Sequence, residues 1–165
     1  DHLDHFDLDA MQNIQKQETI LILRPICSDR VPEGWIVSNG ESLSVLSIGV
    51  QAVPAFNVVH RRDNGQLFHP PGIGNGYVLT FGDKRIYIAG DTENIAEMKT
   101  LQRIDCAFLP MSPPSTMTPE MVADAAKAFK PKILYPYHYK DTDPHKLVTL
   151  LHDTPGIEVR IRQLR

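Results

Sequence analysis

The 165-residue sequence predicts an α/β fold, and three observations support that class. Short apolar runs bounded by turn residues, such as residues 104–109 and 133–136, have the length of buried strands. Between them, residues 118–129 carry apolar side chains at helical spacing. A short turn at Gly82-Asp83 joins two further strand-like runs into a hairpin. Because neither a repeat nor a linker divides the chain, we expect one domain over residues 1–165.

The first third of the chain predicts one helix and one short strand. Residues 8–16 have apolar side chains at three-residue steps and an aspartate near their start, which predicts a helix. Residues 19–23 form an apolar run stopped by a proline, which predicts a strand buried on both faces. Residues 25–35 are rich in turn residues, and Asn39-Gly40 predicts a tight turn.

The middle third combines strands with one long loop. Residues 44–55 alternate loosely between two faces, which predicts a strand. Residues 57–76 have no regular period, and a long irregular loop in a compact domain is usually functional or disordered. Residues 77–81 and 84–89 form the two strands of the hairpin.

The last third alternates helices with strands. The predicted elements are a short helix over residues 94–102, a strand over 104–109, a helix from Thr118, a strand over 133–136, a helix from Asp143 and a strand over 157–161. Thr118-Pro119-Glu120 combines an N-cap, a proline in the first turn and an acid that complements the helix dipole. The final strand alternates apolar and charged residues, so we expect one of its faces to contact solvent.

Composition excludes some partner classes. The net charge of −3 provides no basic field for nucleic acid, and no apolar run approaches the roughly 20 residues of a membrane span. We therefore expect a small-molecule substrate and a cytoplasmic protein. The chain begins at Asp1 without a methionine, so we expect residues upstream of it, and an export signal among them stays open.

Cys27 and Cys106 are far apart in apolar contexts, which favours two buried thiols in a reducing compartment.

The first ten residues concentrate metal-binding side chains. His2, Asp4 and His5 are close enough in sequence to line one cavity, and zinc selects His and Asp ligands. By themselves these residues also fit an acidic N-terminus with solvated histidines.

Three later features favour the metal site. They lie at predicted strand ends or in loops, where open α/β sheets place their sites: Phe68-His69-Pro70, Gly90-Asp91-Thr92 and Tyr137-His138-Tyr139. Taken singly, Asp91 fits a turn aspartate, His138 a hydrogen-bonded core imidazole and His69 a turn cap. Their joint occurrence with the N-terminal cluster predicts a metal centre.

These features together resemble the metallo-β-lactamase superfamily, and within it the L-ascorbate-6-phosphate lactonase-like branch of metal-dependent hydrolases. The stretches that carry the resemblance are Asp1–Asp7, Ala52–Asn57, Phe68–Pro70, Gly74–Tyr77, Ile86–Glu93, Thr116–Thr118 and Tyr135–Tyr139. The resemblance runs the length of the chain and is most specific around Gly90-Asp91-Thr92 and His138. It implies a metallo-β-lactamase-like αββα sandwich, present here as its C-terminal part. The family's first His would stand one residue before Asp1, and the preceding strand-rich half of the sandwich is absent from this sequence.

The same resemblance implies a set of metal ligands. His2 and His69 would hold one metal, Asp4, His5 and His138 would hold a second, and Asp91 would bridge the two. Two Zn²⁺ ions suit this donor set, with Mn²⁺ as an alternative. The catalytic residues would be Asp91 and Asp4, the latter orienting a water molecule that the metals activate. His60 competes with His69 for the third histidine position, and we favour His69 because it precedes a proline and a glycine-rich segment.

The implied function is a hydrolase that acts on an ester, lactone, amide or phosphoester bond with water activated by two metals. The alternative is a non-catalytic metal-binding or inert fragment of such a fold, which the absent first ligand favours. A sheet without its partner layer also favours assembly into a homo-oligomer.

Overall fold

The computed structural model describes residues 6–164, and the chain divides into two compact units, Asp1–Ser38 and Asn39–Arg165. Each unit is described by itself, and the single domain expected from the sequence stays a prediction. Among the described residues, no helix is both long and apolar enough to cross a membrane.

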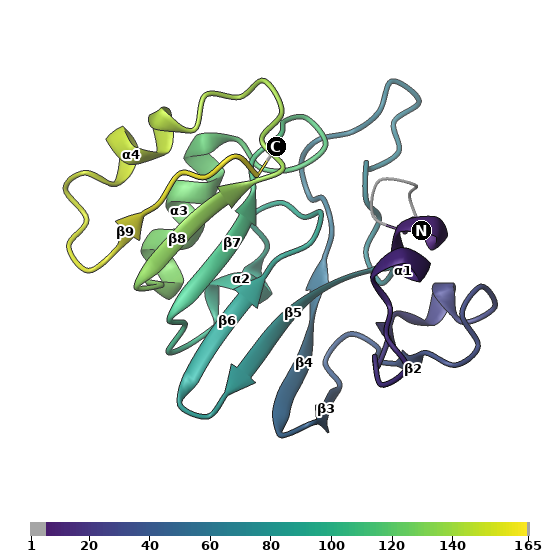
Figure 1. The fold of residues 1–165 in the computed structure, drawn as a ribbon. Coiled ribbons are helices and arrows are strands. Elements are labelled where there is room, and N and C mark those ends of the chain that lie inside the picture. The colour runs from purple at the N-terminus through teal and green to yellow at the C-terminus, as the bar shows by residue number, and fades with distance from the viewer. Residues whose placement is uncertain (1–5, 165) are drawn as a thin grey trace. The chain divides into compact units, whose positions relative to one another are not determined.

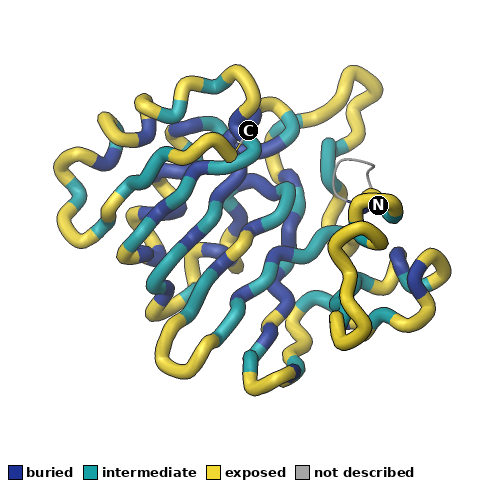
Figure 2. Tube along the Cα trace, in the orientation of Figure 1, coloured by how far each residue is buried: buried dark blue, intermediate teal, exposed yellow. Residues whose placement is uncertain are grey.

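The first unit is small and largely exposed (Figures 1 and 2). Helix α1 (Leu8–Ile14) is confirmed, and it begins at Asp7, whose side chain accepts a hydrogen bond from the Ala10 N–H. A single 3₁₀ turn, η1 (Pro25–Cys27), follows strand β1 (Ile22–Leu23), which pairs in parallel with β2 (Trp35–Ile36). The prediction of a strand buried on both faces is wrong at β1, because its two residues are only half-buried in a two-stranded sheet.

A seven-stranded mixed sheet forms the frame of the second unit (Figure 1). Its strands, in spatial order, are β3 (Ser42–Val45), β4 (Ile48–Ala55), β5 (Gly74–Phe81), β6 (Lys84–Ile88), β7 (Cys106–Pro110), β8 (Ile133–Tyr137) and β9 (Glu158–Val159). The pairings from β3 to β6 are antiparallel and those from β6 to β9 are parallel. The predicted hairpin over residues 77–89 corresponds to β5 and β6.

The single strand predicted over residues 44–55 is wrong. The chain forms a hairpin instead, in which β3 and β4 pair from Val45 with Ile48 outward. Leu46 and Ser47 make the turn with φ values of 49° and 63°. Tight hairpin turns need positive φ, and Gly or Asn usually supplies it, so this turn has no composition signal. The predicted final strand over 157–161 is also shorter, because only the two residues of β9 pair with β8.

Three helices complete the second unit: α2 (Ala96–Lys99), α3 (Pro119–Phe129) and α4 (His145–Leu151). Helix α3 begins as predicted, since the Thr118 hydroxyl accepts a hydrogen bond from the Met121 N–H at 3.2 Å. Figure 1 shows α2 and α3 against one face of the sheet. The core that they cover contains fully buried side chains from strands and helices, among them Tyr87, Met98, Leu109, Val122, Leu134 and Leu147.

The opposite side chains of the central strands are apolar and only partly covered. Phe108 and Tyr135 stack with their ring centroids 5.0 Å apart, and both are half-buried. Ile88 on β6 is exposed. Cys106 on β7 is half-buried rather than buried as predicted, whereas Cys27 is buried, and both are free thiols.

Strand direction concentrates four loops at one edge of this sheet. Because β4 is antiparallel to β5 and β5 to β6, strand β4 runs in the same direction as β6, β7 and β8. The carboxyl ends of these four strands therefore meet at one edge. The residues that follow them are the candidates for a functional site.

Candidate metal centre

The turn after β6 brings Asp91 to the sheet edge. Gly90 adopts a φ of +67°, and a Cβ there would lie 2.6 Å from the carbonyl oxygen of Asn75. The next residue after Asp91 is buried Thr92, whose hydroxyl exchanges hydrogen bonds with the backbone N–H and C=O of Phe56, each at 3.1 Å. The segment after β6 is thereby fixed to the segment after β4, and Asp91 is held between two anchored neighbours.

His69 and Asp91 face each other, although 21 positions separate them in the sequence. The Nε2 atom of His69 lies 3.3 Å from the Oδ2 atom of Asp91. The side chains of His69 and Asp91 are 14% and 13% exposed, so the pair is only slightly accessible to solvent. His60, the other candidate for this position, contacts Glu93 instead.

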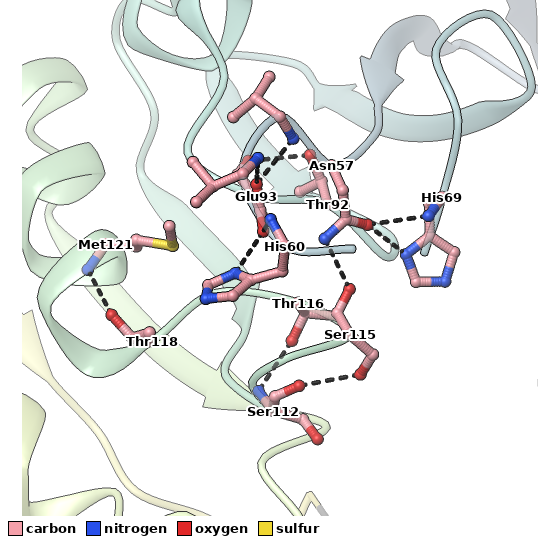
Figure 3. Close-up of polar contacts among 12 residues, drawn as sticks. Asn57, His60, His69, Thr92, Glu93, Ser112, Ser115, Thr116, Thr118 and Met121 are labelled. Atoms are coloured by element: carbon pink, nitrogen blue, oxygen red, sulfur yellow. Dashed lines mark hydrogen bonds and ion pairs between the residues drawn. The ribbon is translucent and has the colours of Figure 1, made fainter. Parts of the chain in front are cut away.

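Asn57 holds the other side of the His69 ring (Figure 3). Its Oδ1 atom is 2.8 Å from His69 Nδ1 and accepts the His69 backbone N–H at 3.0 Å. The amide nitrogen of Asn57 donates to the carbonyl oxygen of Ser115 at 3.0 Å. Asn57 is fully buried, so these contacts connect the loops after β4 and β7 out of reach of solvent.

Glu93 fixes the start of the long loop (Figure 3). Its fully buried carboxylate accepts the backbone N–H groups of Val58, Val59 and His60 at 2.6–2.9 Å, and it contacts His60 Nδ1. Burial by itself would raise the pKa of Glu93. The hydrogen bonds from the Val59 and His60 N–H groups and from the Asn57 amide outweigh that effect and lower the pKa below its usual value.

His138 follows β8 at the same edge. Its φ of 48° turns the chain sharply after the strand, and its N–H donates to the carbonyl oxygen of Leu164. The preceding Tyr137 lies within the electrostatic influence of Asp91. Burial raises the pKa of the Tyr137 phenol and the Asp91 charge raises it further, whereas the Gly90 backbone lowers it slightly.

The structure brings together part of the predicted site. His69 and Asp91 are in contact, and His138 follows a parallel strand at the same sheet edge. His2, Asp4 and His5 lie outside the described residues, so their role as ligands stays a prediction. Within residues 6–164, no three His, Cys, Asp or Glu side chains form a complete metal-binding group.

The donor chemistry of the His69–Asp91 pair fits a bound cation. The Asn57 oxygen at Nδ1 requires the ring proton there, and a neutral imidazole then carries a lone pair at Nε2. That lone pair faces a carboxylate oxygen at 3.3 Å, and a positive charge, either a second ring proton or a metal cation, would stabilise the two electron-rich atoms. An imidazole and a carboxylate that converge in this way are suitable ligands for zinc.

Reasoning from the sequence gave no role to Asn57 or Glu93. Both fall in stretches that carry the family resemblance, Ala52–Asn57 and Ile86–Glu93, and that was the only available signal. Their partners are mostly backbone groups in distant segments, and neither residue belongs to a recognisable ligand spacing.

Comparisons with known proteins identify the family of the chain. A model of the beta-lactamase superfamily domain matches residues 1–139. A UPF0173 metal-dependent hydrolase of Listeria monocytogenes serovar 1/2a is 41% identical over 157 residues, a match that covers 84% of this chain and 68% of the relative. A second one, from Listeria welshimeri, is 32% identical with the same coverage.

Solved structures share the fold. A candidate metal-dependent hydrolase from Parabacteroides distasonis superposes with a TM-score of 0.93 at 46% identity, covering all of this chain and 74% of that one. Igni18, a metallo hydrolase from Ignicoccus hospitalis, superposes with a TM-score of 0.79 at 22% identity and covers 99% of this chain and 73% of its own. The mixed α/β fold is the metallo-β-lactamase fold, and the chain belongs to the metallo-β-lactamase superfamily of metal-dependent hydrolases.

Proposed function

We propose that the protein uses two metal ions to hydrolyse an ester, lactone, amide or phosphoester bond in a small molecule. The observation that carries this proposal is the contact between His69 Nε2 and Asp91 Oδ2 at the carboxyl edge of the sheet. An imidazole and a carboxylate that converge from distant segments at a sheet edge are the donor types that a zinc site brings together.

The ligands proposed from the sequence extend this pair. His69, His138 and Asp91 come from the described part of the chain, and His2, Asp4 and His5 are added on their motif alone. Zn²⁺ suits this mixture of imidazoles and carboxylates, and Mn²⁺ is the alternative. When bound, such ions supply a Lewis acid and an activated water near neutral pH.

The chain's own residues prepare the site for that chemistry. Asn57 orients the His69 ring, and the Gly90 turn presents the Asp91 carboxylate toward it. The Tyr137 phenol keeps its proton beside Asp91 and is therefore available as a neutral hydrogen-bond donor. The Glu93 carboxylate holds the backbone of residues 58–60, so the start of the long loop keeps one conformation.

Two finer proposals follow from the sequence motifs. Lactones are the first substrates to test, because the resemblance is to the L-ascorbate-6-phosphate lactonase-like branch.

We also propose that a strand-rich layer covers the apolar side chains around Phe108 and Tyr135. Their partial exposure supports this, as does the 68% coverage of the Listeria monocytogenes relative.

The test compares metal content and hydrolysis in three proteins. The wild-type chain is loaded with Zn²⁺ or Mn²⁺, dialysed, and measured for bound metal and for turnover of generic lactone and phosphodiester substrates. Asp91→Ala is expected to lose at least one metal per chain and to lower turnover by about 100-fold or more, because it removes the proposed bridging ligand. Asp83→Ala is the matched control, since Asp83 is an exposed aspartate in the turn at the other end of β6.

The two candidate functions give different results. Two metals per wild-type chain with turnover that depends on Asp91 support the hydrolase. Metal without turnover identifies a non-catalytic metal-binding protein, and a wild-type chain that retains no metal contradicts the proposal and identifies an inert fragment.

A further inference from the structure

We propose that Asn57 is a positioning residue that fixes the tautomer and orientation of His69. Asn57 thereby presents the Nε2 lone pair of His69 to a metal shared with Asp91. The inference deepens the proposed function and rests on it for its purpose.

The orientation of the Asn57 amide is determined by three contacts. The nitrogen donates to the Ser115 carbonyl oxygen at 3.0 Å, and the amide also hydrogen-bonds to the Glu93 carboxylate. Both partners only accept hydrogen bonds, so the nitrogen must face them. The oxygen then faces His69, where it accepts the backbone N–H at 3.0 Å. A reversed amide would set oxygen against oxygen at Ser115 and nitrogen against N–H at His69.

The surroundings of Asn57 are rigid on both sides (Figure 3). On one side, Glu93 holds the backbone of the next three residues through their N–H groups. On the other side, the loop after β7 is closed by hydrogen bonds between Ser112 and Thr116 in both directions, at 2.8 and 3.0 Å. Asn57 also donates its own backbone N–H to the His69 carbonyl oxygen at 2.8 Å. Asn57 and His69 are therefore joined through both backbone and side chain.

This arrangement determines which ring nitrogen of His69 carries the proton. The Asn57 oxygen lies 2.8 Å from Nδ1, and a carbonyl-type oxygen accepts but cannot donate. Nε2 also faces an oxygen, that of Asp91, but at 3.3 Å, so the shorter contact assigns the proton of the neutral ring to Nδ1 and leaves Nε2 as the electron-pair donor. Nε2 is the atom that faces Asp91 at 3.3 Å. Metal-bound histidines characteristically have such a hydrogen bond on the nitrogen that does not bind the metal.

The decisive measurement is the tautomer of His69 in the metal-free chain. Long-range ¹H–¹⁵N correlation spectra of histidine-labelled protein, recorded at a pH where the ring is neutral, distinguish protonated from unprotonated nitrogens. The His69 signals are assigned by their loss in His69→Gln. We expect a protonated Nδ1 and an unprotonated Nε2. This result does not depend on the folding of any Asn57 variant or on metal binding, so it separates the present inference from the proposed function.

Variants test the consequence for the metal. Asn57→Leu is close in size and removes every polar contact, so it should release the tautomer preference and weaken Zn²⁺ binding by about 10- to 100-fold, measured by competition with a chromogenic chelator. Asn57→Asp keeps an acceptor for His69 and should keep the tautomer, but it sets a carboxylate oxygen against the Ser115 carbonyl and the Glu93 carboxylate and should therefore lower stability. The matched control is Ser115→Ala, which removes the bond from the Ser115 hydroxyl to the Ser112 carbonyl but keeps the carbonyl that contacts Asn57. The control should bind Zn²⁺ like the wild type.

Two outcomes would overturn the inference. One is a wild-type His69 whose neutral ring is protonated at Nε2. The other is a folded Asn57→Leu protein with the wild-type tautomer and affinity. If Asn57→Leu does not fold, the wild-type spectrum decides. If the wild-type chain shows the expected tautomer but binds no Zn²⁺, the proposed function fails while the orienting role of Asn57 stands.

Discussion

At the scale of single residues, Gly90 combines a positive φ with a close backbone contact at the position of a Cβ. Gly90 lies two residues after the end of β6, and its positive φ belongs to the left-handed region that residues with a side chain disfavour. The backbone carbonyl oxygen of Asn75 would lie only 2.6 Å from a Cβ at position 90. A backbone atom moves only with its strand, so any side chain at position 90 would push β5 and the turn apart. Asp91, the next residue, would move with them.

We therefore predict that Gly90→Ala both destabilises the chain and disturbs the candidate metal centre. The left-handed conformation should cost about 1–2 kcal/mol, and the contact with Asn75 should add about 1–3 kcal/mol of overpacking. Urea unfolding measures the loss of stability, and Zn²⁺ competition measures the loss of affinity.

Gly82→Ala is the matched control for this prediction. Gly82 has a φ of +59°, yet a Cβ there would meet no atom within 4 Å. The control should lose only the conformational part of the stability and keep its Zn²⁺ affinity. Equal losses in the two variants would show that the approach of Asn75 has no consequence.

Residue chemistry also explains which part of the site the sequence could predict. His69 and Asp91 were predictable as metal ligands because each lies in a distinctive motif and because imidazoles and carboxylates are the usual ligands of zinc. Asn57 was not, because its role depends on the Ser115 carbonyl 58 positions away. A backbone carbonyl is present at every position, so a sequence contains no sign that this particular one is a partner.

At the scale of elements, Asp105 connects three neighbouring strands at the end of the sheet opposite the metal centre. It immediately precedes β7, and its carboxylate accepts the Arg85 backbone N–H of β6 at 2.9 Å. Its other oxygen contacts Lys132 Nζ, just before β8, at 2.6 Å. The Lys132 hydrogen bond is the main cause that lowers the pKa of Asp105, and the Arg85 N–H adds to it.

This shift predicts a stability contribution that is lost in acid. A carboxylate whose pKa is lowered by folding stabilises the folded state above the unfolded pKa of about 3.9 and loses that effect as the pH falls through the folded pKa. Asp105→Asn should therefore have a lower urea midpoint than the wild type at pH 7, and the difference should shrink below about pH 3.9. A difference that is the same at both pH values would show that the charge of Asp105 does not stabilise these strands.

Elements with strong local signals were predicted well, and those without them were not. Thr118 and Pro119 mark the start of α3 because an N-cap and a first-turn proline have a direct physical effect on helix ends. The turn at Leu46 and Ser47 has no such residue, and the β3–β4 hairpin was therefore read as one strand. Here the four residue pairs between β3 and β4 form although the turn between them has no residue that favours it.

At the scale of the whole molecule, the two units differ in how much apolar surface they bury. The core of the second unit contains twenty buried residues from strands and helices. In the described part of the first unit, the core consists of Phe6, Cys27 and Val31 with partly buried neighbours. The alternation of strands and helices predicted the α/β class correctly, since it reflects the large core. It did not reveal this imbalance, because a run such as residues 19–23 is as apolar as a core strand.

This difference predicts unequal protection against hydrogen exchange. A two-stranded sheet over a small core is marginally stable by itself, whereas amides of a large core exchange only through extensive unfolding. The Trp35 and Val37 N–H groups, which bond to Leu21 and Leu23, should exchange at least about 100-fold faster than the amides that pair β5 with β6. Amide exchange followed by NMR at neutral pH gives both rates in one sample, after correction for the intrinsic rate of each residue. Equal protection in the two sheets would contradict the prediction, because it would mean that the first unit opens only when the entire chain unfolds.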